Sequence, residues 1–223
     1  MLVDKPLFDL NIPNIHDYLS LIKDSGLFAG LTNFLNKYKD KIDTYPASTK
    51  YHHFWSGGWR DHVEQVLFFS FSEYSIIYPS NRFSFFSTQV QGENPIPINM
   101  DLLIAGSILH DAEKLNRYTP SDKENEFFVM RGGVAYTLKS KWDYTKNYKP
   151  GVRLIHEDME SVQMAADCGI PITKELINVI CGAAGGYSNM AREVAPLPEA
   201  VILHMADYKS AQIYWAHGKI KDK

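Results

Sequence analysis

Residues 101–115, DLLIAGSILHDAEKL, place a histidine and an aspartate at the end of an almost wholly apolar segment. A helix that is apolar all round is buried in a core, and Asn99 or Asp101 can cap the start of this one. Burying an unpaired charge is costly, so His110 and Asp111 need a partner or a metal ion. Adjacent residues cannot share one face of a regular helix, so the pair can meet one ion only if the helix ends or distorts there.

Apolar periodicity predicts helices along most of the remaining chain. They are expected at 14–24, 27–40, 60–77, 153–168, 173–184 and 197–217, with a break at Ser25-Gly26 and a long connection at 78–97. A small β-hairpin is expected around 127–138, where Gly132-Gly133 supplies a turn. The sequence therefore predicts an all-α protein, with residues 1–223 in a single domain and two N-terminal helices within residues 14–40.

Composition excludes several classes of protein. The chain has 223 residues, a 45% hydrophobic content suited to one core, and two cysteines, which are too few for a disulfide framework. A net charge of −3 offers no broad basic surface, so extended nucleic acid is not an expected partner. The chain shows no signal-peptide pattern and no apolar run of roughly 20 residues. We expect a cytoplasmic protein without a membrane partner.

A second ionisable residue lies on an apolar helical stripe near the end of the chain. Asp207 shares this stripe with Ala200, Leu203, His204 and Ala211, so it is predicted to point inward. The alternative is an acid that pairs with a lysine or caps a neighbouring helix. His204 is expected to be a core residue whose ring finds a hydrogen-bond partner.

Imidazole and carboxylate groups together suit a particular set of metal ions. Mixed nitrogen and oxygen donors favour Mn, Fe, Co, Ni or Zn, whereas a site of oxygens alone suits Mg or Ca. Two histidines and two aspartates would make a site of the first kind.

Four stretches together resemble the HD-domain metal-dependent phosphohydrolases, whose ligands follow the order H…HD…D. They are HHFWSGGWRDHVEQV, LLIAGSILHDAEKL, HEDMESV and PEAVILHMADYKSA, and the resemblance covers roughly residues 50–215. It implies a helical bundle of the HD type with a metal-binding core over that range. It also implies one divalent transition metal ion, held by His62, His110, Asp111 and Asp207.

The resemblance further implies catalytic roles for Lys114, Asp111 and His156. Lys114 matches a lysine that often follows the HD pair, where it would neutralise charge on a phosphate. The alternative for Lys114 is an exposed lysine at a helix end, favoured by the helix dipole. Glu113 is expected to be solvated. His156 matches a histidine of many relatives and would be a ligand at a second metal site or a phosphate contact.

Two further positions bear on the metal count. His52 and His53 precede a glycine turn and also match the family, but we expect a structural role for them and not ligation. Ala183, in CGAAGG, stands where relatives with this layout often carry a histidine. A ligand for a second ion would therefore be missing, and a mononuclear centre is predicted.

Three functions are compatible with these residues. The first is a hydrolase that uses metal-activated water to release phosphate from a small phosphorylated substrate, expected to be a nucleotide. The second is an exonuclease that acts on RNA or DNA ends. The third is a catalytically inactive HD module that binds a nucleotide or a protein partner. The single compact domain and the acidic isoelectric point favour the first.

Overall fold

The computed structural model describes residues 12–49, 51–77, 98–131, 134–145, 156–185 and 195–218. These residues are mostly helical, with one two-stranded antiparallel sheet, so the predicted all-α class with a small hairpin is confirmed. The helices are α1 (Ile15–Leu19), α2 (Ser25–Lys37), α3 (Lys39–Thr44), α4 (Gly58–Ile77), α5 (Met100–Leu109), α6 (Lys114–Arg117), α7 (Glu157–Ala166), α8 (Lys174–Gly182) and α10 (Pro198–Gly218). The strands are β1 (Tyr118–Arg131) and β2 (Val134–Tyr144).

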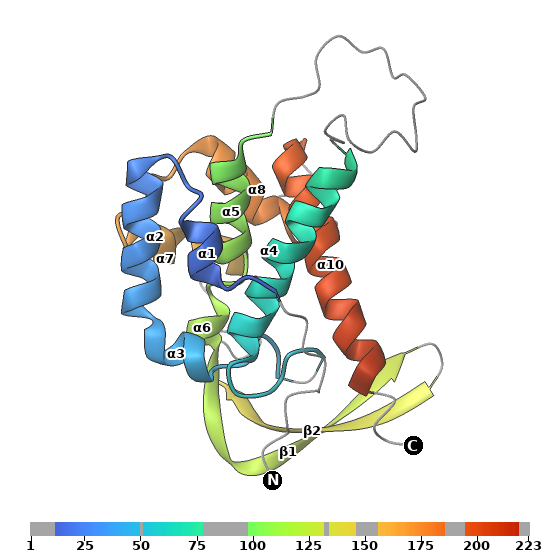
Figure 1. Cartoon of the computed structure of the whole chain (residues 1–223). Coiled ribbons are helices and arrows are strands. Elements are labelled where there is room, and N and C mark those ends of the chain that lie inside the picture. The colour runs from blue at the N-terminus through green and yellow to red at the C-terminus, as the bar shows by residue number, and fades with distance from the viewer. Residues whose placement is uncertain are drawn as a thin grey trace.

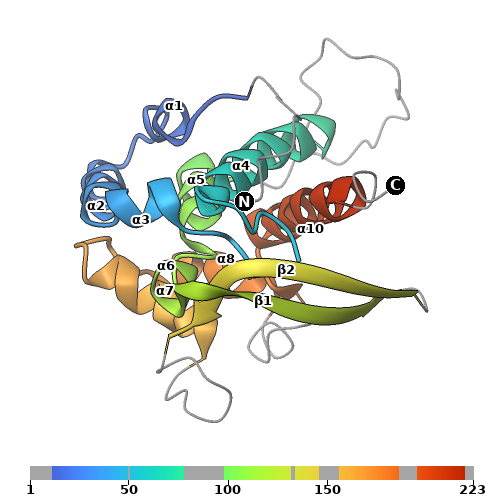
Figure 2. The same cartoon turned by 90° about the horizontal axis from the view of Figure 1, so that it is seen from below.

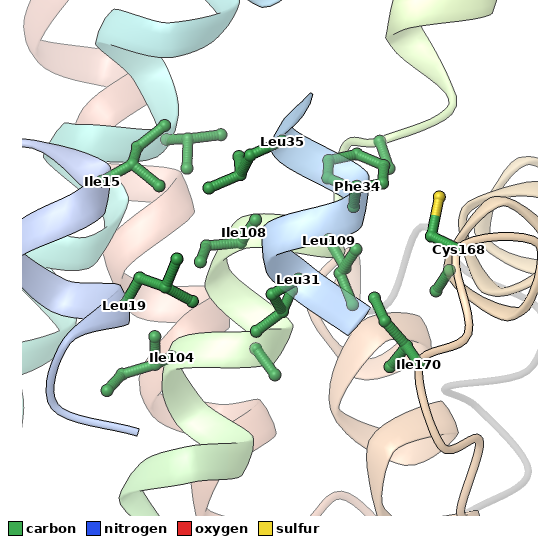
Figure 3. Packing of buried hydrophobic residues seen from close by; sticks show 14 of the residues in the cluster. Ile15, Leu19, Leu31, Phe34, Leu35, Ile104, Ile108, Leu109, Cys168 and Ile170 are labelled. Atoms are coloured by element: carbon green, nitrogen blue, oxygen red, sulfur yellow. The ribbon is translucent and has the colours of Figure 1, made fainter. Parts of the chain in front are cut away.

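Helix α5 lies at the centre of the bundle, between α1 and α2 on one side and α4, α8 and α10 on the other (Figure 1). Every residue of α5 from Leu103 to Leu109 is buried, as its apolar sequence predicts. Figure 3 shows Ile104, Ile108 and Leu109 of α5 facing Leu31 and Phe34 of α2. Burial of such side chains contributes roughly 1.5–3 kcal/mol each, so this contact is a main source of the stability of the bundle.

Helices α4 and α10 run side by side although more than 100 residues separate them in the chain (Figures 1 and 2). Between them and α8, a second apolar cluster gathers around Val66, Leu103 and Leu203. Gly106 permits the close approach of α5 and α8, because a Cβ at that position would overlap Val179. This arrangement brings one face of α4 and one face of α10 against the end of α5.

Several helix boundaries differ from the predicted ones. The break expected at Ser25-Gly26 is instead the start of α2, because the Asp24 carboxylate caps the helix by accepting from the Leu27 N–H at 2.8 Å. The helix predicted over 27–40 is divided at Tyr38 into α2 and α3. The helix predicted over 173–184 begins at Lys174, where Thr173 caps it, and ends at Gly182.

The hairpin is longer than the segment 127–138 that the sequence predicts. Its strands pair from Tyr118 with Tyr144 to Arg131 with Val134, with an irregularity between Pro120 and Asn125. It curves beneath the helices at the end of the bundle where α4 starts and α10 ends (Figure 1). β1 follows α6 directly, so the short helix α6 is the element that joins the hairpin to the His110–Asp111 turn.

The described residues do not test two of the predictions about the whole chain. The connection predicted at 78–97 lies outside the described residues, and the single-domain assignment of residues 1–223 stays a prediction. None of the described helices combines the length and the apolar character needed to cross a bilayer.

Candidate metal centre

His62 lies in the second turn of α4 with its ring fully buried. The start of this helix is tied to the end of α5, because the indole N–H of the buried Trp59 donates to the carbonyl oxygen of Asp111 at 2.8 Å. Gly58 lets the preceding turn pack tightly, since a Cβ there would overlap the His53 carbonyl. The first turns of α4 therefore hold His62 at a fixed position relative to the His110–Asp111 segment.

The His110–Asp111 pair lies where α5 ends. The last residue of α5 is Leu109, and a turn with hydrogen bonds from Ala112 N–H to Leu109 and from Lys114 N–H to Asp111 leads to α6, so the regular helix ends at the pair as the sequence analysis required. His110 Nδ1 lies 3.0 Å from the carbonyl oxygen of Ser107. A carbonyl only accepts, so His110 carries a proton on Nδ1, and its Nε2 is the atom left to bind a cation.

Asp207 lies on the face of α10 that turns toward α4. Leu203 and Ala206 beside it are fully buried, and the Asp207 side chain is 28% exposed, so it points inward as predicted. His204, one turn earlier, has its Nδ1 2.7 Å from the carbonyl oxygen of Ala183. The prediction of a hydrogen-bonded His204 ring is therefore confirmed.

The structure brings the four predicted ligands together from three parts of the chain. His62 Nε2 lies 3.1 Å from Asp207 Oδ1 and 3.3 Å from Asp111 Oδ2. His110 Nε2 lies 3.8 Å and 3.6 Å from the same two oxygens. One donor atom each from His62, His110 and Asp207 fall within 4.8 Å of one another. This spacing is compact enough for a single ion.

The imidazoles of His62 and His110 indicate that the four predicted ligands fit a cation. In the part of the chain that the structure describes, Nε2 of His62 and Nε2 of His110 are buried without a hydrogen-bond partner. Buried polar atoms are normally hydrogen-bonded, so two orphaned nitrogens that face two carboxylates need an explanation. A divalent ion between them would satisfy all four groups, and the mixed donor set suits a transition metal.

The electrostatics of the cluster also favour positive charge. Burial raises the pKa of Asp207, but His110 and His62 outweigh burial and hold it well below its usual value. Burial likewise opposes ionisation of Asp111, yet Lys114 and His110 keep the pKa of that carboxyl low. Burial lowers the pKa of His110, while Asp111 and Asp207 outweigh it and raise it. Both aspartates are ionised at neutral pH, so the cluster attracts either protons or a metal ion.

Lys114 is the first residue of α6 and lies at the edge of the cluster. Its Nζ is 2.5 Å from Asp111 Oδ2, and its side chain is 16% exposed. Burial lowers the pKa of Lys114, but Asp111 outweighs burial and raises it, so the ammonium keeps its charge. The exposed helix-end position considered as an alternative does not describe this side chain.

His156 and Ala183 make contacts with residues other than the four predicted ligands. His156 caps the start of α7, and its Nδ1 lies 3.1 Å from Asp158 Oδ2. His156 belongs to neither group of possible metal ligands found among the described residues. Ala183 follows α8, is buried, and offers its carbonyl oxygen to His204. The expected catalytic or ligating role of His156 stays a prediction, as does the mononuclear count.

The prediction of a solvated Glu113 is wrong. The Glu113 side chain is almost fully buried, and one of its carboxylate oxygens lies 2.7 Å from Arg117 Nη2. The backbone N–H of Glu113 donates to Ser161 Oγ of α7 at 3.1 Å. Burial raises the pKa of Glu113 to about 7 against the lowering effect of Arg117. The turn after Leu109 redirects the side chain, so helical spacing no longer predicts which way it faces. Arg117 also pairs with Glu157, an ion pair that sequence reasoning missed.

His52 and His53 lie against the cluster. The ring centroids of both are within 5.0 Å of that of His62, and one nitrogen of each of the three rings lies within 4.8 Å of the others. Burial, and then the neighbouring His62, lower the pKa of each well below its usual value, so both rings are neutral at pH 7.

Sequence reasoning missed Gln65 and Ser210, which are both buried and hydrogen-bonded to this group. Each lies three residues after a predicted ligand, His62 or Asp207, so helical spacing was the signal that could have found them.

A comparison with curated proteins finds a similarity over part of the chain. The chain is 37% identical over 82 residues to the 3'-5' exoribonuclease YhaM of Oceanobacillus iheyensis. The match covers 37% of this chain and 20% of that protein, so it extends over a fraction of each. No family model matches the chain. A search of solved structures finds no significant match.

Proposed function

We propose that the chain is a hydrolase that uses a divalent transition metal ion to cleave phosphate esters, with His62, His110, Asp111 and Asp207 as the metal ligands. The observation that carries this proposal is the pair of buried Nε2 atoms that face two carboxylates without hydrogen bonds in the described structure. Keeping such an arrangement for packing alone would cost several kcal/mol.

The charges of the site suit this chemistry. When bound, a divalent ion makes water acidic enough to supply hydroxide near neutral pH and polarises a phosphoryl oxygen. Asp111 and Asp207 offset the two positive charges of the ion, while the imidazoles of His62 and His110 bind it as neutral donors. The side chains come from the ends or faces of rigid helices, which holds them in place without a substrate.

Lys114 is the residue proposed to contact the phosphate. Its ammonium cannot ligate a cation, but it lies beside Asp111 and is partly exposed. A phosphate that contacts the ion would bring its nonbridging oxygens into reach of this group, which would stabilise charge that develops on them. Lys114 would then exchange part of its contact with Asp111 for a contact with substrate.

The proposed substrate is the 3' end of an RNA chain. The similarity to a 3'-5' exoribonuclease supports this choice over the small nucleotide that the sequence analysis favoured. A small nucleotide is the second candidate, because a net charge of −3 provides little general attraction for a polyanion. The two candidates share the metal site and differ in what binds beyond the scissile phosphate.

The test uses a 5'-labelled single-stranded RNA with Mg²⁺, Mn²⁺, Co²⁺ or Ni²⁺, beside a phosphate-release screen of ribo- and deoxynucleotides. The proposed substrate predicts a ladder of products shortened from the 3' end. Asp207→Asn should abolish the activity, whereas Asp43→Asn should keep it, because Asp43 is an exposed partner of Arg60. Phosphate release from nucleotides without RNA shortening would select the second candidate. No hydrolysis of either substrate with any of the ions would overturn the proposed function.

A further inference from the structure

A chain of buried hydrogen bonds runs behind the candidate metal centre. Gln65 Oε1 lies 3.0 Å from Ser210 Oγ and 3.2 Å from His53 Nε2. Ser210 Oγ lies 3.0 Å from His62 Nδ1, and His53 Nδ1 lies 3.0 Å from His52 Nδ1. Gln65, Ser210 and His53 are all buried. The amide oxygen of Gln65 is therefore hydrogen-bonded to His53 on one side and, through Ser210, to His62 on the other.

The direction of each hydrogen bond follows from the groups involved. An amide oxygen has lone pairs and no proton, so both Ser210 Oγ and His53 Nε2 must donate to Gln65 Oε1. Ser210 has a single hydroxyl proton, so its oxygen can only accept from His62. The proton of neutral His62 is then on Nδ1, and the Nε2 that faces Asp111 and Asp207 carries a lone pair.

The directions of the two hydrogen bonds of the His53 ring follow from the same reasoning. His53 donates through Nε2, so in its neutral form its Nδ1 accepts from His52 Nδ1. The backbone of His53 adopts a left-handed conformation with φ 46°, which is uncommon for a residue other than glycine. Its carbonyl oxygen accepts from the Ala47 N–H at 3.0 Å and lies where a Cβ on Gly58 would be. The turn before α4 thus holds His53 in a conformation of higher energy that keeps its ring against Gln65.

We propose that Gln65 and Ser210 are positioning residues that fix the tautomer of His62, so that its Nε2 faces the metal site as an unprotonated ligand. Without the Gln65 oxygen, the Ser210 hydroxyl is free to turn and donate to His62 Nδ1, which would move the imidazole proton to Nε2 and block that atom as a ligand. Gln65 therefore acts on the metal site through Ser210, without touching the ion. This inference rests on the proposed metal centre and adds the groups that prepare one of its ligands.

The experiment measures the affinity of the purified chain for Mn²⁺ and for Zn²⁺ alone by calorimetry, with no substrate present. Groups that orient a ligating histidine typically account for about 10- to 100-fold in metal affinity. Ser210→Ala and Gln65→Leu should each weaken binding by about that factor, while Ser210→Thr, which keeps the hydroxyl, should bind like the unmodified chain. Because the two residues act in series, the double variant should lose no more than the more affected single variant.

Ser70→Ala is the matched control. Ser70 is a fully buried serine on α4 that contacts the Ser107 hydroxyl, and it lies eight residues, or roughly 12 Å of helix rise, beyond His62. It should keep metal affinity, whatever its effect on the free energy of unfolding. Ser210→Ala binding as tightly as Ser70→Ala, or losses that add in the double variant, would overturn the inference while leaving the metal centre intact. An unmodified chain that binds neither ion would overturn the metal centre and the positioning role together.

Discussion

Trp59→Phe tests whether the start of α4 supports the candidate metal centre as well as the core. The substitution removes an indole N–H that donates to the Asp111 carbonyl at 2.8 Å, and it shortens a ring that is fully buried. The same carbonyl accepts from the Lys114 N–H at 3.2 Å, so it keeps one partner, and the lost bond should cost only ~1 kcal/mol. The smaller ring leaves a partial cavity, worth ~1–2 kcal/mol by comparison with larger deletions.

The free energy of unfolding should therefore fall by ~2–3 kcal/mol, which for a chain of this size lowers Tm by about 4–12 °C. Urea denaturation followed by circular dichroism would measure the loss, and calorimetry with Mn²⁺ would show weaker binding, because Asp111 loses a restraint. A loss of stability below about 0.5 kcal/mol with unchanged metal affinity would refute the argument that this indole joins α4 to the His110–Asp111 turn.

Three further predictions concern packing, cysteine chemistry and metal removal. Gly106→Ala should lower the free energy of unfolding by ~1–3 kcal/mol, because the new methyl group would overlap Val179. This loss should exceed the ~1 kcal/mol by which alanine favours helix formation over glycine. A gain in Tm would contradict the prediction. Burial raises the pKa of Cys181 to about 11, so a thiol reagent at pH 8 should modify it slowly until urea unfolds the chain, and rapid labelling of the folded protein would show that it is accessible. Removing bound metal with a chelator should lower Tm, and restoring Mn²⁺ to 100 times its Kd should recover ~2.7 kcal/mol; an unchanged Tm would show that no ion binds the folded chain.

The helical class and the inward position of Asp207 were predictable because both depend on the spacing of apolar residues within one helix. The hairpin was predictable in place but not in length, since no apolar alternation marks its first residues, YTPSDKEN. The burial of Glu113, which the sequence did not predict, depends on where a helix ends. Glu113 is buried because α5 stops at Leu109 and the following turn redirects its side chain. A periodic pattern contains no information about that turn.

The hydrogen bonds that join Gln65, Ser210 and His53 were not predicted, for a different reason. Helical spacing places Gln65 near His62 and Ser210 near Asp207, but the hydrogen bonds of the group join residues that lie 12 to 148 positions apart in the chain. The neighbours of a buried polar side chain are set by tertiary packing. They can be found only once α4 and α10 are placed beside each other.

The pairing of α4 with α10 has a consequence for how the protein is made. His62 and Asp207 are separated by 145 positions, so an emerging chain has completed every other described helix before the last one can contribute its carboxylate. Long-range contacts of this kind form late, because a long loop must close first. His62, His110 and Asp111 are therefore synthesised before Asp207, whose carboxylate completes the set of donors. Truncation within the last helix should then leave a chain with most of its apolar core and no complete set of donors.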